Sequence, residues 1–75
     1  MDYDVNGPGS IRIIVYDRNG REVFNRLIAD RNTGTYTEEW DGRDGQGNVL
    51  PSSFYHLKIF KDGVFIKGIK AVVIN

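Results

Sequence analysis

One short segment holds most of the side chains that could bind a metal ion. Asp41, Asp44, Gln46 and Asn48 bring together, within eight residues, oxygen atoms of the kind that Ca²⁺ prefers. Their spacing is not the Asp-x-Asp-x-Asp-Gly of an EF-hand loop, and no closing glutamate supplies a bidentate ligand. The glycines of this segment do not form a phosphate loop either, because no Lys-Ser or Lys-Thr pair follows them. Calcium therefore stays an alternative to the default interpretation, a turn stabilised by its own side chains.

Residues suited to catalysis are scarce in the chain. His56 is the only histidine and there is no cysteine. The chain therefore lacks almost all the residues that Ser-His-Asp triads, Cys-His pairs and histidine-rich metal sites need. Ser52 and Ser53 follow a proline in an expected turn and do not resemble a nucleophile elbow. The carboxylates of Asp41 and Asp44 belong to solvated turns, whereas a general acid needs a raised pKa in a cleft. We expect neither an enzyme nor a cofactor.

The charge balance bears on the partners of the protein. The chain has 75 residues, with ten Lys or Arg and ten Asp or Glu, so its net charge is zero. This balance removes the strongest electrostatic argument for nucleic acid, although one basic and aromatic hairpin remains, diluted by acids. The hairpin residues are Arg12, Arg18, Arg21, Arg26, Tyr16 and Phe24. No stretch approaches the ~20 apolar residues of a transmembrane helix, and no signal peptide is visible in this chain.

The charges are unevenly distributed along the chain. Six arginines and nine acids lie up to Asp44, while four lysines and one acid follow it, which gives net charges of −3 and +3. Two faces or ends of opposite sign would favour a head-to-tail contact between copies. Interleaved strands would instead mix these charges.

The composition predicts an all-β chain. Valine and isoleucine number fifteen and aromatic residues nine, against three leucines and two alanines. Branched and aromatic side chains pack on a pleated surface and lose rotamer freedom in a helix. Nine glycines, with Asn and Asp, punctuate the chain at the turn rhythm of a small sandwich or barrel.

Several segments alternate apolar and polar residues in the way that strands do. The expected strands are 11–17, 22–28, 35–40, 54–61 and 64–74. Residues 35–40 are only half apolar, which indicates an edge strand, and 29–34 form a charged loop. Residues 1–10 are expected to be a flexible, frayed segment, except around Tyr3 and Val5, and 11–75 a single domain.

Turn residues set the expected register. A type I turn with Gly20 as a left-handed bulge residue places Asp17 opposite Arg21. Asp62-Gly63 predicts a type I′ hairpin that sets Phe60 against Phe65 and Ile59 against Ile66. Continuing this alternation would point Lys70 into the core. A bulge at Gly68 is therefore expected to turn Ile69, Ala71 and Val73 inward. The 69–74 segment then outruns its hairpin partner, and we expect it to pair with residues 11–16.

Two separated blocks of the chain resemble a known family pattern. A strand ending in Tyr-Asp leads through a glycine turn to a valine, and later a Trp-Asp-Gly turn leads through Leu-Pro to a tyrosine. The residues that carry this pattern are Asp17, Gly20, Trp40, Asp41, Gly42, Asp44, Gly47, Leu50, Pro51 and Tyr55. The pattern, over residues 11–75, resembles the immunoglobulin-like domain of bacterial flagellar hook-capping proteins and the related C-terminal domains of gliding-motility and type IX secretion cargo proteins. The closing 66–74 segment is more similar to the gliding-motility branch. At Ser53 these families usually have glycine.

The resemblance implies a small immunoglobulin-like β-sandwich, mostly antiparallel, with five or six strands and no long helix. It implies a non-catalytic structural or interaction module that serves sorting, anchoring or appendage assembly. Such a module would lie outside the cell or on its surface, as part of a larger exported protein. The alternative is a calcium- or carbohydrate-binding sandwich that uses the loop from Trp40 to Asn48.

The strand edges bear on the oligomeric state. The opening strands of a complete family domain are not visible in the sequence, and the 11–16 and 69–74 segments are long and β-branched, so an unpaired edge beside either is adhesive. Phe60 and Phe65 are expected to face outward and to form an apolar patch suited to a protein partner. We therefore expect a protein partner or neighbouring domain and, for the isolated chain, a homodimer formed by edge pairing or strand exchange.

Overall fold

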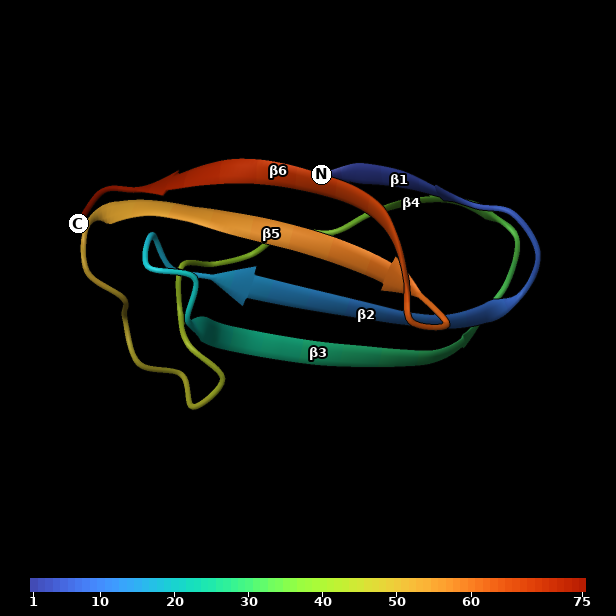
Figure 1. The fold of residues 1–75 in the computed structure, drawn as a ribbon, viewed down its shortest axis with the longest axis horizontal. Coiled ribbons are helices and arrows are strands. Elements are labelled where there is room, and N and C mark those ends of the chain that lie inside the picture. Colours follow the sequence, from blue (N-terminus) through green and yellow to red (C-terminus); the bar gives the residue numbers. More distant parts are fainter.

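The computed structural model describes residues 1–75 as two antiparallel sheets with no helix (Figure 1). The six strands are β1 (Asp2–Val5), β2 (Gly9–Tyr16), β3 (Glu22–Arg31), β4 (Gly34–Thr37), β5 (Ser53–Lys61) and β6 (Val64–Val73). One sheet has the order β3-β2-β5-β6, and β1 pairs with β4 in the other. The predicted all-β sandwich with five or six strands is confirmed. The chain contains no helix of the length and apolarity needed to cross a membrane.

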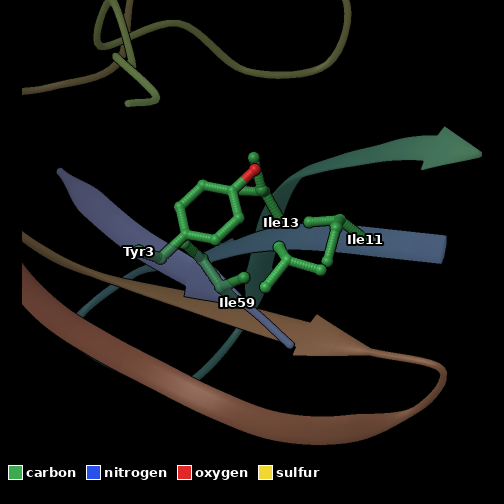
Figure 2. Packing of buried hydrophobic residues seen from close by; sticks show 5 residues of the cluster. Tyr3, Ile11, Ile13 and Ile59 are labelled. Atoms are coloured by element: carbon green, nitrogen blue, oxygen red, sulfur yellow. The ribbon is translucent and has the colours of Figure 1, made fainter. Parts of the chain in front are cut away.

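The core lies between the two sheets because alternate residues of the central strands point the same way. Ile11, Ile13 and Val15 of β2 are buried beside Tyr55, Leu57 and Ile59 of β5, as the alternation predicts. The side chains of β1 cover part of this layer, and Figure 2 shows Tyr3 packed over the isoleucines. Each fully buried Ile or Val side chain stabilises the fold by about 1.5–3 kcal/mol.

The N-terminal segment is part of the sandwich. Asp2–Val5 pairs with β4 along its whole length, and the side chains of Tyr3 and Val5 are among the most buried in the chain. This arrangement differs from the frayed segment that the sequence predicts, although Tyr3 and Val5 are the two residues expected to be ordered. The physical reason is that β1 covers Ile11, Ile13 and Ile59, which would otherwise face water.

The two predicted hairpin turns are confirmed. Asp17 pairs with Arg21 through its amide, and Gly20 has a φ of 83°. Asp62 and Gly63 have φ values of 48° and 83°, and a type I′ turn requires a positive φ at both of these positions. Outside the turns the strand boundaries differ. β3 continues to Arg31, where the sequence predicts a loop from residue 29, and β4 ends at Thr37 rather than at residue 40.

The last hairpin corrects two predictions of register. Phe60 does pair with Phe65, but Ile59 pairs with Lys67 and not with Ile66, because the bulge lies directly after Phe65. This bulge still produces the predicted change of parity, and places Ile69, Ala71 and Val73 in pairs with inward-facing residues of β5. The bulge is not at Gly68. Gly68 instead lies against the Phe65 ring, because a Cβ on Gly68 would be only 3.3 Å from the Phe65 Cζ.

The predicted pairing of the final strand with residues 11–16 is wrong. β5 begins at Ser53 and therefore accompanies β6 as far as Val73. β2 already has β3 on one side and β5 on the other, so it has no free edge. β6 is consequently an edge strand along its whole length.

Candidate functional site

The Trp-Asp-Gly turn closes one end of the sandwich. The Trp40 indole Nε1 donates to the Arg43 carbonyl at 2.9 Å, and its ring packs edge-on against Tyr55 with centroids 5.2 Å apart. The Tyr55 hydroxyl in turn donates to the carbonyl of Pro51 at 2.6 Å. Trp40 and Leu50 both lie against the second part of the core, which Val15, Tyr55 and Leu57 form. This arrangement covers apolar side chains and exposes no reactive group.

Gly42 holds the turn in place through its backbone. It is buried and has a φ of 78°, a conformation that glycine adopts without strain. Its carbonyl accepts a hydrogen bond from the amide of Leu50, and Arg43 forms a bridge with Val49. The nearest side chain to a Cβ at this position would be Val73, at 3.6 Å. The turn thus joins the loop to the end of β6.

The first of two similar aspartate turns follows β2. Asp17 Oδ1 accepts hydrogen bonds from the amides of Asn19 and Arg21, both at 2.9 Å, and Oδ2 faces the Arg21 Nε at 3.3 Å. The Gly20 amide donates to the Asp17 carbonyl. These hydrogen bonds to the ionised carboxylate, that from Arg21 foremost, hold the pKa of Asp17 below its usual range.

The second aspartate turn repeats this geometry within the glycine-rich loop. Asp44 Oδ1 accepts hydrogen bonds from the amides of Gln46 and Asn48, both at 2.9 Å, and Oδ2 accepts one from the Asn48 side chain. The Gly47 amide donates to the Asp44 carbonyl, as in the first turn. The backbone hydrogen bonds, that of Asn48 foremost, lower the pKa of Asp44. An Asp followed three residues later by Gly is the sequence signal common to both turns.

The candidate calcium ligands are already engaged with the protein. Both oxygens of Asp44 accept hydrogen bonds, and Asp41 Oδ1 accepts one from the Arg43 amide. Gln46 and Asn48 contribute their backbone amides to the turn, so amide protons surround the Asp44 Oδ1. No three or more His, Cys, Asp or Glu side chains are grouped to hold a metal ion. The geometry favours a self-stabilised turn.

A polar cluster joins the two sheets on the β3–β4 side, and the sequence analysis missed it. Arg31 Nη1 donates to the Tyr3 hydroxyl at 2.9 Å and to Glu38 Oε1 at 2.8 Å, and Tyr3 donates to the same oxygen. Arg26 lies 3.6 Å from Glu38 Oε2, and the Arg31 guanidinium stacks on Tyr36. Burial and the Glu38 charge raise the pKa of Tyr3, which makes it a weaker acid. No sequence signal connects these residues, because they come from three separate segments.

The opposite side of the sandwich is open. β1 and β6 are neighbouring edges there (Figure 1). The Lys67 Nζ of β6 donates a hydrogen bond to the Asp2 carbonyl of β1. A pocket between them has Tyr3, Ile66 and Lys67 in its walls. Apolar side chains of β6 and of the residue after it are exposed to solvent on this side and on the outer face. They are Val64, Phe65, Ile66, Ile69, Val72 and Ile74.

The predicted interface pair lies on the outer face beside this edge. Phe60 and Phe65 pack edge-to-face with centroids 5.8 Å apart, and Phe65 is 53% exposed. Further along the same face, Phe54 lies against His56, and Lys70 Nζ is 4.4 Å from the Phe54 ring centre. His56 is thus an exposed residue on the outer face of a strand. Phe65 and Phe54 extend the apolar surface of the edge.

The basic and aromatic hairpin residues do not form one surface. Arg26 faces Glu38 between the sheets, whereas Arg21 is held at the Asp17 carboxylate. Phe24 packs inward against the second part of the core. Ser53, where the resembling families usually have glycine, has a buried hydroxyl without a hydrogen-bond partner.

The fold and these surfaces define a small immunoglobulin-like β-sandwich module whose β6 edge is unpaired and apolar. The chain belongs to the FlgD Ig-like domain family, whose pattern matches residues 3–63. Among solved structures, the crystal structure of FlgD from P. aeruginosa is similar, with a TM-score of 0.74 and 22% sequence identity over 92% of this chain. The chain spans 56% of that FlgD chain. Comparison with curated protein sequences gives no match.

Proposed function

We propose that this domain is a non-catalytic protein-interaction module that acts in the assembly of a hook-like surface appendage. It works outside the cell or at the cell surface, as part of a larger exported protein. The observation that carries this proposal is the unpaired, apolar β6 edge on a sandwich of the FlgD Ig-like family. Exposed apolar patches beside a free edge are typical of protein-binding surfaces.

The chemistry of the remaining surface supports a binding role. The ionisable residues of the polar cluster, Tyr3, Arg31 and Glu38, are bonded to one another and connect the sheets. The pKa of Tyr3 is raised, and those of Asp17 and Asp44 are lowered; neither direction produces an acid or base poised near neutrality. These groups support the fold, and β6 is the edge strand that combines unpaired backbone groups with several exposed apolar side chains.

A titration tests the proposal. The isotope-labelled chain is mixed with the purified hook-subunit protein of the same bacterium, and the backbone amide signals are followed by NMR. The signals of β6 are expected to shift while those of β3, the other edge of the same sheet, stay in place. Val72→Glu, on the exposed outer face of β6, should weaken binding at least ten-fold, and Leu27→Glu, on the outer face of β3, should not. Unchanged β6 signals would refute the proposed appendage role.

The sorting role implied by the gliding-motility resemblance stays a prediction. The sequence that flanks this domain in its gene tests it, because a long secreted enzyme or adhesin upstream indicates sorting and a hook-assembly region indicates capping. The calcium or carbohydrate alternative would show as a rise of several degrees in melting temperature on adding Ca²⁺ or glycans.

The homodimer predicted from the sequence depends on the same edge. In that dimer two copies would pair through β6, which has no neighbour on its outer side. The two lysines of this strand oppose such pairing, so the homodimer is the alternative to a strand from another protein. Light scattering at ~100 μM and ~1 μM measures this directly, because a dimer dissociates on dilution.

A further inference from the structure

β6 differs from the other edge of its sheet in the charges that it carries. β3 has both arginines and acids, and Arg26 and Arg31 face Glu38 across the sandwich. β6 has two lysines, Lys67 and Lys70, and no acid in ten residues. Eight of these ten residues are exposed to solvent. The free backbone groups of β6 are therefore flanked, on their own strand, by positive charge alone. Two acids of the neighbouring β1, Asp2 and Asp4, line the pocket beside Lys67, and their carboxylates accept hydrogen bonds from Thr37 and Thr35 of β4.

The neighbouring strand reinforces this charge. All four lysines of the chain lie in β5 and β6. Asp62, in the turn of this hairpin, is its one acid, and its carboxylate accepts a hydrogen bond from the Ser10 amide. The acidic residues of the rest of the chain lie on other elements. The +3 part of the sequence thus forms one edge of the molecule.

The two lysines of β6 lie on different faces of the sheet. Lys67 pairs with the inward-facing Ile59 and reaches β1, whereas Lys70 pairs with the outward-facing His56 and lies over the Phe54 ring. A strand added beside β6 would pass both lysines. Carboxylates three positions apart on that strand would reach one lysine on each face.

A second copy of β6 is a poor occupant of this edge. It would bring two more lysines and no carboxylate in any register, and like charges across neighbouring strands are destabilising. A strand with acids meets the same backbone groups without this repulsion. Ile69 lies between the two lysines and Val72 follows them, and both side chains are exposed. The added strand should therefore also carry apolar residues that cover them.

We propose that the β6 edge binds an extended segment of a partner protein that adds as a further strand and carries carboxylates opposite Lys67 and Lys70. This inference rests on the proposed interaction function and names the chemistry of its partner. Main-chain hydrogen bonds supply affinity in this mode of binding, and side chains supply specificity. The lysines select acidic partners and exclude copies of the domain.

Matched peptides test the inference on the intact chain. The first probe contains the ten-residue sequence Val-Thr-Val-Glu-Val-Thr-Glu-Val-Thr-Val, with a serine added at each end. The second has lysine in place of both glutamates, and the third keeps the glutamates but carries methyl groups on alternate backbone nitrogens. Binding is measured from NMR shifts of the β6 amides. We expect the glutamate peptide to bind at least ten-fold more tightly than either of the others.

A charge-reversed protein makes the test reciprocal. In the variant Lys67→Glu with Lys70→Glu, the lysine peptide should bind more tightly than the glutamate peptide. The matched control, Arg18→Glu with Arg21→Glu, changes the net charge equally at the β2–β3 turn and should keep the original order. Melting curves establish that each variant is folded.

Each other result overturns the inference in a distinguishable way. Equal binding of the glutamate and lysine peptides would show that the edge accepts strands without regard to charge, and the proposed function would stand. Equal binding of the methylated peptide would exclude main-chain pairing. A dimer of the unmodified chain with protected β6 amides would make a second copy the occupant. If the peptides leave β6 unaffected while hook subunits shift it, only the strand chemistry is wrong.

Discussion

At the scale of single residues, Gly42 is a buried position that requires a left-handed backbone conformation. Its φ is 78°, and a Cβ there would lie in ordinary contact with Val73, so space is not the obstacle. Gly42→Ala should lower the free energy of unfolding by about 1–2 kcal/mol, the cost of a left-handed conformation in a residue with a Cβ. Gly45→Ala in the same loop is the control, since its φ is not positive and its surroundings are open. Urea unfolding measures both, and equal losses would contradict this account.

Asp44 makes the stability of the loop depend on pH. Its pKa is lower in the folded than in the unfolded protein, so its ionised form stabilises the fold above the unfolded value of about 3.9. This contribution is lost as the pH falls through the lower, folded pKa. Asp44→Asn should therefore melt below the wild-type protein at pH 7 and approach it as the pH falls below about 3.9.

The matching turn provides a second measurement of the same effect. Asp17→Asn should show the same convergence of melting temperatures, because the pKa of Asp17 is lowered by the same kind of backbone hydrogen bonds. Calorimetry between neutral pH and pH 2.5 follows both variants. A difference in melting temperature that stays constant over this range would exclude a role for the charge.

At the scale of elements, Glu38 connects the end of β4 to β3 and β1. Glu38→Ala would leave the Tyr3 hydroxyl and the Arg31 guanidinium without their shared acceptor in a partly buried site. We expect a loss of about 2 kcal/mol in the free energy of unfolding, the usual cost of hydrogen bonds to a charged group. Glu39→Ala is the matched control, because the neighbouring glutamate points to solvent. If Glu39→Ala lowers the free energy of unfolding by a comparable amount, Glu38 acts through its negative charge in general and not through the hydrogen bonds of the cluster.

Elements whose pattern is local are the ones that the sequence predicts well. In β5 the buried residues Tyr55, Leu57 and Ile59 follow from alternation alone, and the Asp62-Gly63 turn follows from the residues that its φ values require. The need for a bulge in β6 also follows from parity. Its position does not, because it depends on the Phe65 ring lying over Gly68.

Pairings between distant segments could not be predicted from the sequence. β1 pairs with β4 about thirty residues away, and its four residues contain only two apolar side chains. The role of Glu38 is invisible for the same reason, since its partners lie on two other strands. The turn residues follow from their types and spacing, whereas the open β6 edge follows only from the pairing of β5 with β6 along the whole of β6.

At the scale of the whole molecule, the proposed role of the β6 lysines predicts how copies of the chain associate. If the lysines keep copies apart, the unmodified chain should be a monomer at ~100 μM, and an equimolar mixture with the Lys67→Glu, Lys70→Glu variant should form a heterodimer. The mixed pair places carboxylates and lysines on adjacent strands, where opposite charges are favourable. Light scattering measures the masses, and the heterodimer should weaken as salt is added. A mixture that stays monomeric, or an unmodified chain that dimerises, would contradict this mechanism.

The short ladder of β1 has a mechanical consequence. β1 has four residue pairs with β4, whereas β6 has nine with β5, so tension applied through the two ends of the chain meets unequal resistance. β1 should detach first and uncover Ile11, Ile13 and Ile59, while the β5–β6 hairpin persists. In the proposed appendage role, the domain would then extend by a short step before it ruptures. Optical-tweezer traces should show this small early extension before the main rupture. Glu38→Ala should shift the early extension to lower force. A single rupture with no early extension would exclude the detachment of β1 before the rest of the domain.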